Sequence, residues 1–149
     1  MIDIEDFGKV EIRIGTILEA TKVPDADRLL QLIFDFGPMP AVVASEVKQS
    51  SSEEEIASSQ APRNDNIERL PELLEKYPDR DVRQIMSAIA PFVPDPSTLV
   101  GKQIAVCTNL EPRKFRGYIS QGMIMATDNE EGVVFLVPEK KVQPGAKIH

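Results

Sequence analysis

The chain is poor in the residues that build covalent cross-links and metal sites. Its 149 residues include one cysteine, one histidine and no tryptophan. One cysteine cannot form an internal disulfide, and one cysteine with one histidine cannot supply the four ligands of a structural zinc site. We therefore expect a reducing compartment, and the sequence excludes a disulfide framework and a zinc-built fold.

Long apolar runs and an excess of basic residues are also missing. No apolar stretch approaches the roughly 20 residues that cross a bilayer as a helix. The acidic start MIDIED lacks the basic region of a signal peptide. With 24 acidic and 17 basic side chains the net charge is −7, which excludes indiscriminate attraction to nucleic acid or anionic membranes. We expect a cytoplasmic protein without a targeting segment or a membrane partner.

Groups suited to covalent or acid–base catalysis are scarce. His149 is the last residue, and Cys107 lies in an apolar alternating segment, where a buried and unreactive thiol is expected. Residues 117–122 have the spacing G-x-x-S-x-G instead of the G-x-S-x-G of a nucleophile elbow, and no phosphate-binding glycine motif occurs. The aspartates lack the order of a calcium loop. The sequence therefore predicts no enzymatic activity, no cofactor and no metal ion.

What the sequence does contain is a series of short segments typical of β-strands. Residues 9–23 alternate apolar and polar side chains around Gly15, which predicts one long strand that bends. After a turn at 24–27, residues 30–36 alternate again and complete a hairpin. Four further β-rich segments, separated by proline or glycine, cover residues 83–90, 103–110, 121–127 and 132–138.

A helical turn is predicted between the third and fourth candidate strands of the chain, at 83–90 and 103–110. Asp95 can cap it, Pro96 suits its first position and Gly101 can end it. Five or six short strands with a helix at this place is the order of an OB-fold, a five-stranded Greek-key barrel, here with a C-terminal β extension. The predicted class is therefore all-β, and an SH3-like or other small barrel fits the strand count almost as well.

A segment at about 41–82 interrupts the strand pattern. Residues 45–66 are rich in Ser, Glu and Asn and have few apolar side chains, which predicts disorder. Leucines spaced three and four apart predict a short helix at 70–77. A structureless stretch of this length is uncommon inside a compact domain. We therefore expect one domain over residues 1–149 that is interrupted by an insertion.

Most of the acidic charge belongs to that insertion. Residues 45–81 hold ten acidic and five basic side chains, a net charge of −5, which leaves −2 for the rest of the chain. Residues 102–117 hold four basic side chains and one acidic side chain, a local charge of +3. The candidate barrel is thus nearly neutral and carries one basic loop.

The loop at 109–123 combines several groups that can bind RNA. It contains three cations, amide side chains, a serine hydroxyl and two aromatic rings. Cations can bind phosphates, while rings and amides can stack on bases or hydrogen-bond to them. A solvated basic loop without a ligand explains the same composition equally well. Composition alone leaves both alternatives open.

Three stretches carry a resemblance to a known family. They are KVEIRIGTILEATKVPDADRLLQLIFDFG, RQIMSAIAPFVPDPSTLVGKQIAVCTNLEPRKFRGYISQGMIMA and FLVPEKKVQPGAKI. With the motif N-L-x-P-R-K-x-x-G-x-x-S-Q-G-M, they resemble the tRNA-binding domain of bacterial methionyl-tRNA synthetases and of stand-alone structure-specific tRNA-binding proteins. The resemblance implies an OB-fold without catalysis and recognition of tRNA by shape at its outer corner. It also implies a homodimer whose interface includes the segment after the last barrel strand.

The same resemblance implies which residues contact tRNA. The matching loop positions are Asn109, Arg113, Lys114, Ser120, Gln121 and Met123, and Lys22, Arg28 and Arg116 are added as electrostatic candidates. The face next to this loop is assigned to residues 83–89 and to the hairpin turn at 22–28. Ala88 departs from the usual Ser-Gly-Ile-Ala, and the insertion resembles peptides encoded by palindromic repeat elements.

Three functional hypotheses follow. The first is a stand-alone or accessory tRNA-binding module of methionyl-tRNA synthetase, with the catalytic chain as a partner. The second is a secretion-chaperone-like dimer of the same fold that binds unfolded peptide, and the third is a dimerisation unit of the synthetase. The insertion is either tolerated as a surface protrusion, since loop closure entropy grows slowly with length, or its charge screens the basic loop.

Overall fold

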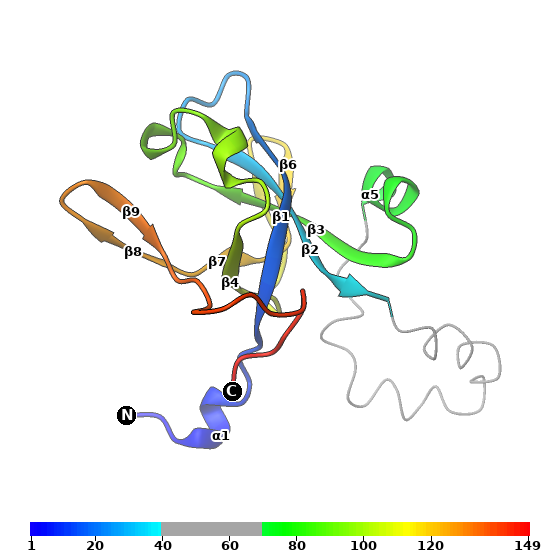
Figure 1. Cartoon of the computed structure of the whole chain (residues 1–149), viewed down its shortest axis with the longest axis vertical. Coiled ribbons are helices and arrows are strands. Elements are labelled where there is room, and N and C mark those ends of the chain that lie inside the picture. Colours follow the sequence, from blue (N-terminus) through cyan, green and yellow to red (C-terminus); the bar gives the residue numbers. More distant parts are fainter. Residues whose placement is uncertain (40–69) are drawn as a thin grey trace.

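The structure, a computed structural model, describes residues 1–39 and 70–149 (Figure 1). The disorder predicted for residues 45–66 lies outside the described residues. The elements in chain order are α1 (Ile4–Phe7), β1 (Ile12–Lys22), β2 (Leu30–Pro38), α5 (Pro71–Lys76), β3 (Arg80–Ser87), the 3-10 helices η2 (Ala90–Phe92) and η3 (Pro96–Leu99), β4 (Gln103–Cys107), β5 (Arg113–Phe115), β6 (Tyr118–Ser120), β7 (Met123–Ile124), β8 (Ala126–Asn129) and β9 (Gly132–Phe135). None of the helices in the described ranges has the length and apolar character needed to cross a bilayer.

Five antiparallel strands form one curled sheet in the order β3-β2-β1-β4-β7. β1 lies at its centre (Figure 1) and serves both halves: residues 12–16 pair with β4, and residues 16–22 pair with β2. β1 therefore belongs to both halves of the sheet, and the sheet curls so that its end strands β3 and β7 approach each other. The all-β class is therefore confirmed, and the curled sheet is consistent with a barrel.

The irregularity of β1 and the role of its Gly15 are separate features. The register between β1 and β2 shifts between Ile17 and Glu19, so the irregularity lies beyond Gly15, where the bend was predicted. Gly15 instead permits close packing, because a Cβ atom there would lie 2.6 Å from the Phe36 ring and 2.7 Å from the Phe34 ring. These two rings stack with centroids 5.8 Å apart in the core.

The core of the sheet is aliphatic apart from these rings. Its buried members come from all the long strands and from both 3-10 helices: Ile17, Leu30, Leu32, Phe34, Phe36, Ile85, Ile89, Ala90, Val93, Leu99, Ile104 and Val106. The predicted helical turn between the third and fourth strands is confirmed as η3. The Asp95 side chain accepts a hydrogen bond from the Ser97 N–H at 3.1 Å and caps it.

The last part of the predicted insertion belongs to the folded sheet. β3 begins at Arg80, three residues before the predicted strand at 83–90, so residues 80–82 pair with β2. α5 lies within the range 70–77 predicted as helical. Its buried Leu73 packs with Ile33 and Val82 on the face of the sheet opposite the main core. The chain is therefore anchored to the sheet from α5 onward.

The C-terminal part folds back on β1. β8 and β9 form a separate two-stranded hairpin. The tail after it runs along β1, where the Ile14 N–H donates to the Ala146 carbonyl and the Ile148 N–H donates to the Ile12 carbonyl, both at 2.8 Å. This hairpin and tail occupy the place of the predicted C-terminal β extension, and the tail covers the edge of β1 that β2 leaves unpaired (Figure 1).

Candidate nucleic-acid interface

The basic loop is a β-hairpin. β5 and β6 pair from Arg113 opposite Ser120 to Phe115 opposite Tyr118. The turn residues Arg116 and Gly117 both have positive φ angles, 52° and 88°, as a two-residue hairpin turn of type I′ requires. The segment that the sequence analysis describes as a basic loop thus contains two short strands, and the hairpin gives its cations a fixed spacing.

The last residue of this hairpin, Ser120, and the residues after it join the hairpin to β3. The Gln121 N–H donates to the Gln84 carbonyl at 2.8 Å, and the Gln121 side-chain oxygen accepts from the Gln84 N–H at 3.0 Å. The Ser120 hydroxyl accepts from the Met86 N–H at 3.0 Å and donates to the Gly122 carbonyl at 3.1 Å. We call this contact between residues 84–86 and 119–122 the seam.

Burial shows what the two polar seam residues do. Only 4% of Ser120 and 2% of Gln121 is exposed. Their side chains take the place of a neighbouring strand for the N–H groups of β3, which would otherwise be buried without a partner. Their contact with tRNA stays a prediction, whereas their structural role follows from these hydrogen bonds.

Asn109 holds the start of the hairpin segment against the N-terminal part of the chain. Its side-chain oxygen accepts from the Glu11 N–H at 2.8 Å, and its side-chain nitrogen donates to the Lys9 carbonyl at 2.7 Å. Both ends of the amide are therefore occupied. Asn109 fixes where the chain leaves β4, and direct contact with tRNA stays a prediction for it as well.

The cations of the hairpin differ from most other arginines of the sheet. Arg113, Lys114 and Arg116 are exposed, and none forms an ion pair within the described ranges 1–39 and 70–149. The Arg113 guanidinium lies 5.5 Å from the centroid of the Phe115 ring, which limits its motion. The hairpin therefore presents three positive charges to solvent without a protein counter-charge.

The turn at 22–28 lies beside this hairpin. Val23, Ala26 and Leu29 form a small apolar cluster with Met86, against which Phe115 and Tyr118 of the hairpin pack. Lys22 and Arg28 are exposed at the two ends of this turn. The structure thus brings both predicted basic segments to neighbouring positions through a shared apolar contact.

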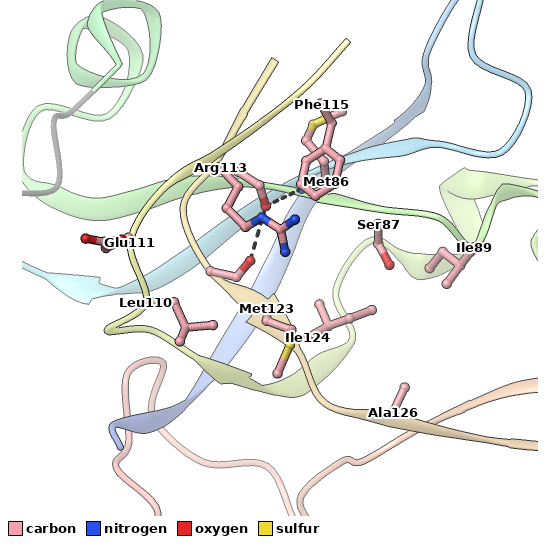
Figure 2. Close-up of a pocket in the computed structure, with 12 residues that line it drawn as sticks. Met86, Ser87, Ile89, Leu110, Glu111, Arg113, Phe115, Met123, Ile124 and Ala126 are labelled. Carbon is pink, nitrogen blue, oxygen red and sulfur yellow. Dashed lines mark hydrogen bonds between the residues drawn. The ribbon is translucent and has the colours of Figure 1, made fainter. Parts of the chain in front are cut away.

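A pocket of about 290 Å³ opens between the hairpin, β3 and β7 (Figure 2). Its apolar walls include Met86, Ile89 and Ile124, and Leu110 and Met123 stand at its rim. Of the predicted site residues, Arg113, Ser120 and Met123 line it, and 51% of Met123 is exposed. In Figure 2 the Arg113 side chain extends over the pocket, and Glu111, which also lines it, directs its carboxylate away from the other labelled side chains.

Sequence reasoning missed the pocket because its walls come from segments far apart in the chain. Residues 83–89 were assigned to a neighbouring face, but no local pattern indicates that Ser87 and Ile89 meet Leu110 and Phe115 across a cavity. The only signal in the sequence was composition. A serine and several apolar side chains occur in the segments 86–89 and 122–126, on either side of the basic segment.

The only cysteine of the chain pairs with Met123 on the neighbouring strand but does not line the pocket. Cys107 is buried at the end of β4, and burial raises the pKa of its thiol. The thiol is therefore protonated at neutral pH, which fits the predicted unreactive side chain.

The comparisons with known proteins agree with this geometry. Residues 61–147, more than half of the chain, match the family described as "Putative tRNA binding domain". The chain belongs to this tRNA-binding domain family.

Curated relatives of this family member are much longer than it is. The chain is 35% identical over 148 residues to the methionine–tRNA ligase of Parabacteroides distasonis, which covers 99% of this chain and 16% of the relative. It is 33% identical over 143 residues to the methionine–tRNA ligase of Enterococcus faecalis, which covers 96% of this chain and 15% of the relative. The chain thus corresponds to a small part of each ligase.

Solved structures match the chain over its whole length. A MetRS related protein from Pyrococcus horikoshii has a TM-score of 0.66 at 25% identity, with 100% of this chain and 98% of that chain covered. The chaperone CsaA from Bacillus anthracis has a TM-score of 0.62 at 21% identity, with 100% and 99% covered. The second likeness is one of fold.

Proposed function

We propose that this chain is a non-catalytic module that binds tRNA by its shape, as a stand-alone or accessory part of methionyl-tRNA synthetase in the cytoplasm. The observation that carries the proposal is the β5–β6 hairpin, whose three cations are exposed and have no ion pair among the described residues. Phosphate oxygens are the ligands that such unpaired cations attract, and they fix register without reading sequence.

An OB-fold barrel is the architecture that we propose for the module. Support comes from the curled five-stranded sheet, from η3 between β3 and β4, and from the seam, which joins β3 to the end of β6 and to the residues just before β7. The barrel would keep the hairpin in one orientation, so that an RNA surface of matching shape meets all three cations together.

The predicted site residues take three roles in this proposal. Arg113, Lys114 and Arg116 bind phosphates, and Lys22 and Arg28 extend the positive surface across the neighbouring turn. Met123 offers an exposed apolar contact. The three remaining residues, Asn109, Ser120 and Gln121, position the hairpin through the hydrogen bonds that they already make.

A salt series tests this proposal. The full chain is titrated with unfractionated tRNA, and we expect the logarithm of the association constant to fall with the logarithm of salt by about 0.9 per phosphate contact. Arg113→Ala with Lys114→Ala should reduce this slope by about two and weaken binding at every salt concentration. Lys114→Ala alone should reduce it by about one.

Lys102→Ala is the matched control for Lys114→Ala. It removes the same charge from an exposed lysine at the opposite end of β4, and we expect tRNA affinity to stay close to that of the unmodified protein. Absence of tRNA binding at low salt would overturn the proposed function. Unchanged tRNA affinity in the double variant would show that the hairpin is not the binding site, and it would favour the hypothesis of a dimerisation unit.

We further propose that the module is a homodimer. α1 has four residues and no buried side chain, and isolated helices of this length are unstable in water. Ile4 at its start is 79% exposed, and Val137 after β9 is 57% exposed. A second copy that covers these side chains would stabilise both segments. Light scattering should give twice the monomer mass, and Val137→Glu should shift it toward the monomer.

Binding of unfolded peptide is the second candidate function, favoured by the apolar walls of the pocket beside the hairpin. The test is competition between tRNA and a permanently unfolded polypeptide, such as reduced and carboxymethylated lactalbumin. Displacement of tRNA by this polypeptide would support a shared face. Binding of tRNA without any displacement favours the tRNA module.

A further inference from the structure

We propose that the pocket between the hairpin, β3 and β7 holds one unstacked nucleobase of the bound RNA. This inference rests on the proposed function, because it gives an unpaired nucleotide of tRNA a place beside the phosphates that the hairpin binds. It adds a site for a base to an interface that otherwise binds the backbone.

The size and walls of the pocket suit a single planar ring. Its volume of about 290 Å³ is at the lower limit of ligand pockets, which start near 300 Å³, and is too small for a helix or a folded peptide segment. Ile89 and Ile124 form apolar walls, and the rim residues Leu110 and Met123 are 42% and 51% exposed. A base that enters would cover these apolar atoms on its two faces.

Two polar groups of the pocket can meet the edge of a base. The Arg113 guanidinium extends over the pocket (Figure 2) and forms no ion pair with any described residue. The half-buried Ser87 hydroxyl has no hydrogen-bond partner among the described residues and can donate or accept. The Ser120 hydroxyl is already occupied by Met86 and Gly122.

The charge around the pocket favours a nucleotide over an apolar peptide side chain. Arg113 belongs to both the pocket and the hairpin, so a phosphate bound there lies within one nucleotide of the cavity. A peptide side chain would fill the cavity but leave the three cations without a counter-charge. RNA proteins commonly bind splayed-out bases of loops in this way, because unpaired bases leave their stack at low cost.

Filling the mouth of the pocket tests the inference. Ala126 lines the pocket at the start of β8 and is exposed, so Ala126→Trp places a large ring in the mouth without entering the core. Thr127→Trp is the matched control, since Thr127 is the next exposed residue of β8, points to the other face of the strand and does not line the pocket. Circular dichroism and melting confirm that both variants are folded.

We expect Ala126→Trp to weaken tRNA binding about tenfold, as loss of one stacked base does, and Thr127→Trp to leave it unchanged. The salt slope should stay the same in both variants, since the phosphate contacts remain. In chemical probing of bound tRNA with dimethyl sulfate, one unpaired nucleotide should be protected by the unmodified protein and by Thr127→Trp, but exposed with Ala126→Trp.

Met123→Ala provides a second variant in case the tryptophan disturbs the fold. It removes an exposed rim side chain, and we expect tRNA affinity to fall about threefold with an unchanged salt slope, as partial loss of stacking on a base implies.

Equal tRNA affinity in Ala126→Trp, Met123→Ala and the unmodified protein would overturn the pocket inference. So would a loss of lactalbumin binding in Ala126→Trp with intact tRNA binding, which would assign the pocket to peptide. Failure of the unmodified protein to bind tRNA at all would instead refute the proposed function. A reduced salt slope in the Arg113 and Lys114 double variant, together with unchanged binding in Ala126→Trp, refutes the pocket alone.

Discussion

Two arginine-rich regions of this protein use the same side chain for opposite purposes. In one, Arg13 and Arg83 lie on either side of Asp81, with their guanidinium carbons 5.4 and 5.5 Å from the Phe36 ring centroid. In the other, the cations of the β5–β6 hairpin are exposed and carry no ion pair among the described residues. We call the first the inner arginine pair.

Hydrogen bonds explain why the inner arginine pair has a structural role. Arg13 donates to the Gly145 and Phe36 carbonyls at 3.3 and 3.0 Å, and Arg83 donates to the Thr108 carbonyl at 2.8 Å. These bonds connect β1, β2 and β3 with the C-terminal tail and with the end of β4. The comparison teaches that neighbouring acceptors, and not the residue type, decide whether an arginine is free for a ligand.

The largest loss of stability is expected from a substitution at Asp81, and it would test the structural role of the inner arginine pair. Asp81→Asn keeps the shape of the side chain but leaves two largely buried arginines without their counter-charge, which should lower the free energy of unfolding by about 3–5 kcal/mol. Urea denaturation followed by circular dichroism measures it. Asp79→Asn, at an exposed carboxylate nearby, is the control and should change little. If Asp81→Asn had the same urea midpoint as the unmodified protein, the structural role of the inner arginine pair would be refuted.

A smaller loss of stability is expected at the seam. Ser120→Ala removes the acceptor for the buried Met86 N–H, which should lower the free energy of unfolding by about 1–3 kcal/mol. Ser87→Ala is the control, since the Ser87 hydroxyl has no partner in the described part of the chain. Should Ser120→Ala keep full stability and lose tRNA affinity, the seam residue would be an RNA contact after all.

At the hairpin turn we expect an effect on binding with almost none on stability. Arg116→Asn removes the charge but keeps a residue type that tolerates the positive φ of 52°. The free energy of unfolding should stay within about 0.5 kcal/mol, and the salt slope of tRNA binding should decrease by about one. Lys102→Asn is the control for charge. A marked loss of stability would place Arg116 with the inner arginine pair.

The last prediction concerns how stability depends on pH, and its effect near neutral pH is the smallest of the four. The dependence should arise in the inner arginine pair, through Asp81. Burial would raise the pKa of Asp81, but the charges and hydrogen bonds of Arg83 and Arg13 outweigh it and hold this pKa below its usual value. Because the folded pKa is the lower one, the stabilisation is complete above the unfolded value, near 3.9, and is lost as pH falls through the folded value. Acid denaturation of Asp81→Asn should lack this step. A step of equal size in the variant would contradict its assignment to Asp81.

The sequence predicts most of the sheet because its long strands follow a simple pattern. The apolar alternation in residues 9–23 and 30–36 corresponds to β1 and β2, and the cap at Asp95 corresponds to η3. Local patterns of this kind depend on residues close together in the chain. The hairpin escaped prediction because each of its strands has three residues, too few for an alternation to be recognised.

The candidate site is less predictable because its geometry is non-local. Polar residues are usually exposed, and no local signal distinguishes the buried Gln121 from the exposed Lys114. The difference arises from Gln84, which is 37 residues away in the chain. The family resemblance singles out this segment as the candidate site, and only the structure separates the side chains that hold it in place from those that face solvent.

The seam also has a consequence for the order of folding. The β1–β2 hairpin joins residues that are close in the chain, whereas the seam joins residues 34 to 37 positions apart through side chains. Contacts of longer separation require more loop-closure entropy, so we expect the seam to close after the β1–β2 hairpin. The basic hairpin would then reach its final orientation only after the seam has closed. A newly synthesised chain would acquire the proposed RNA surface at the end of folding, so that partly folded molecules would lack it.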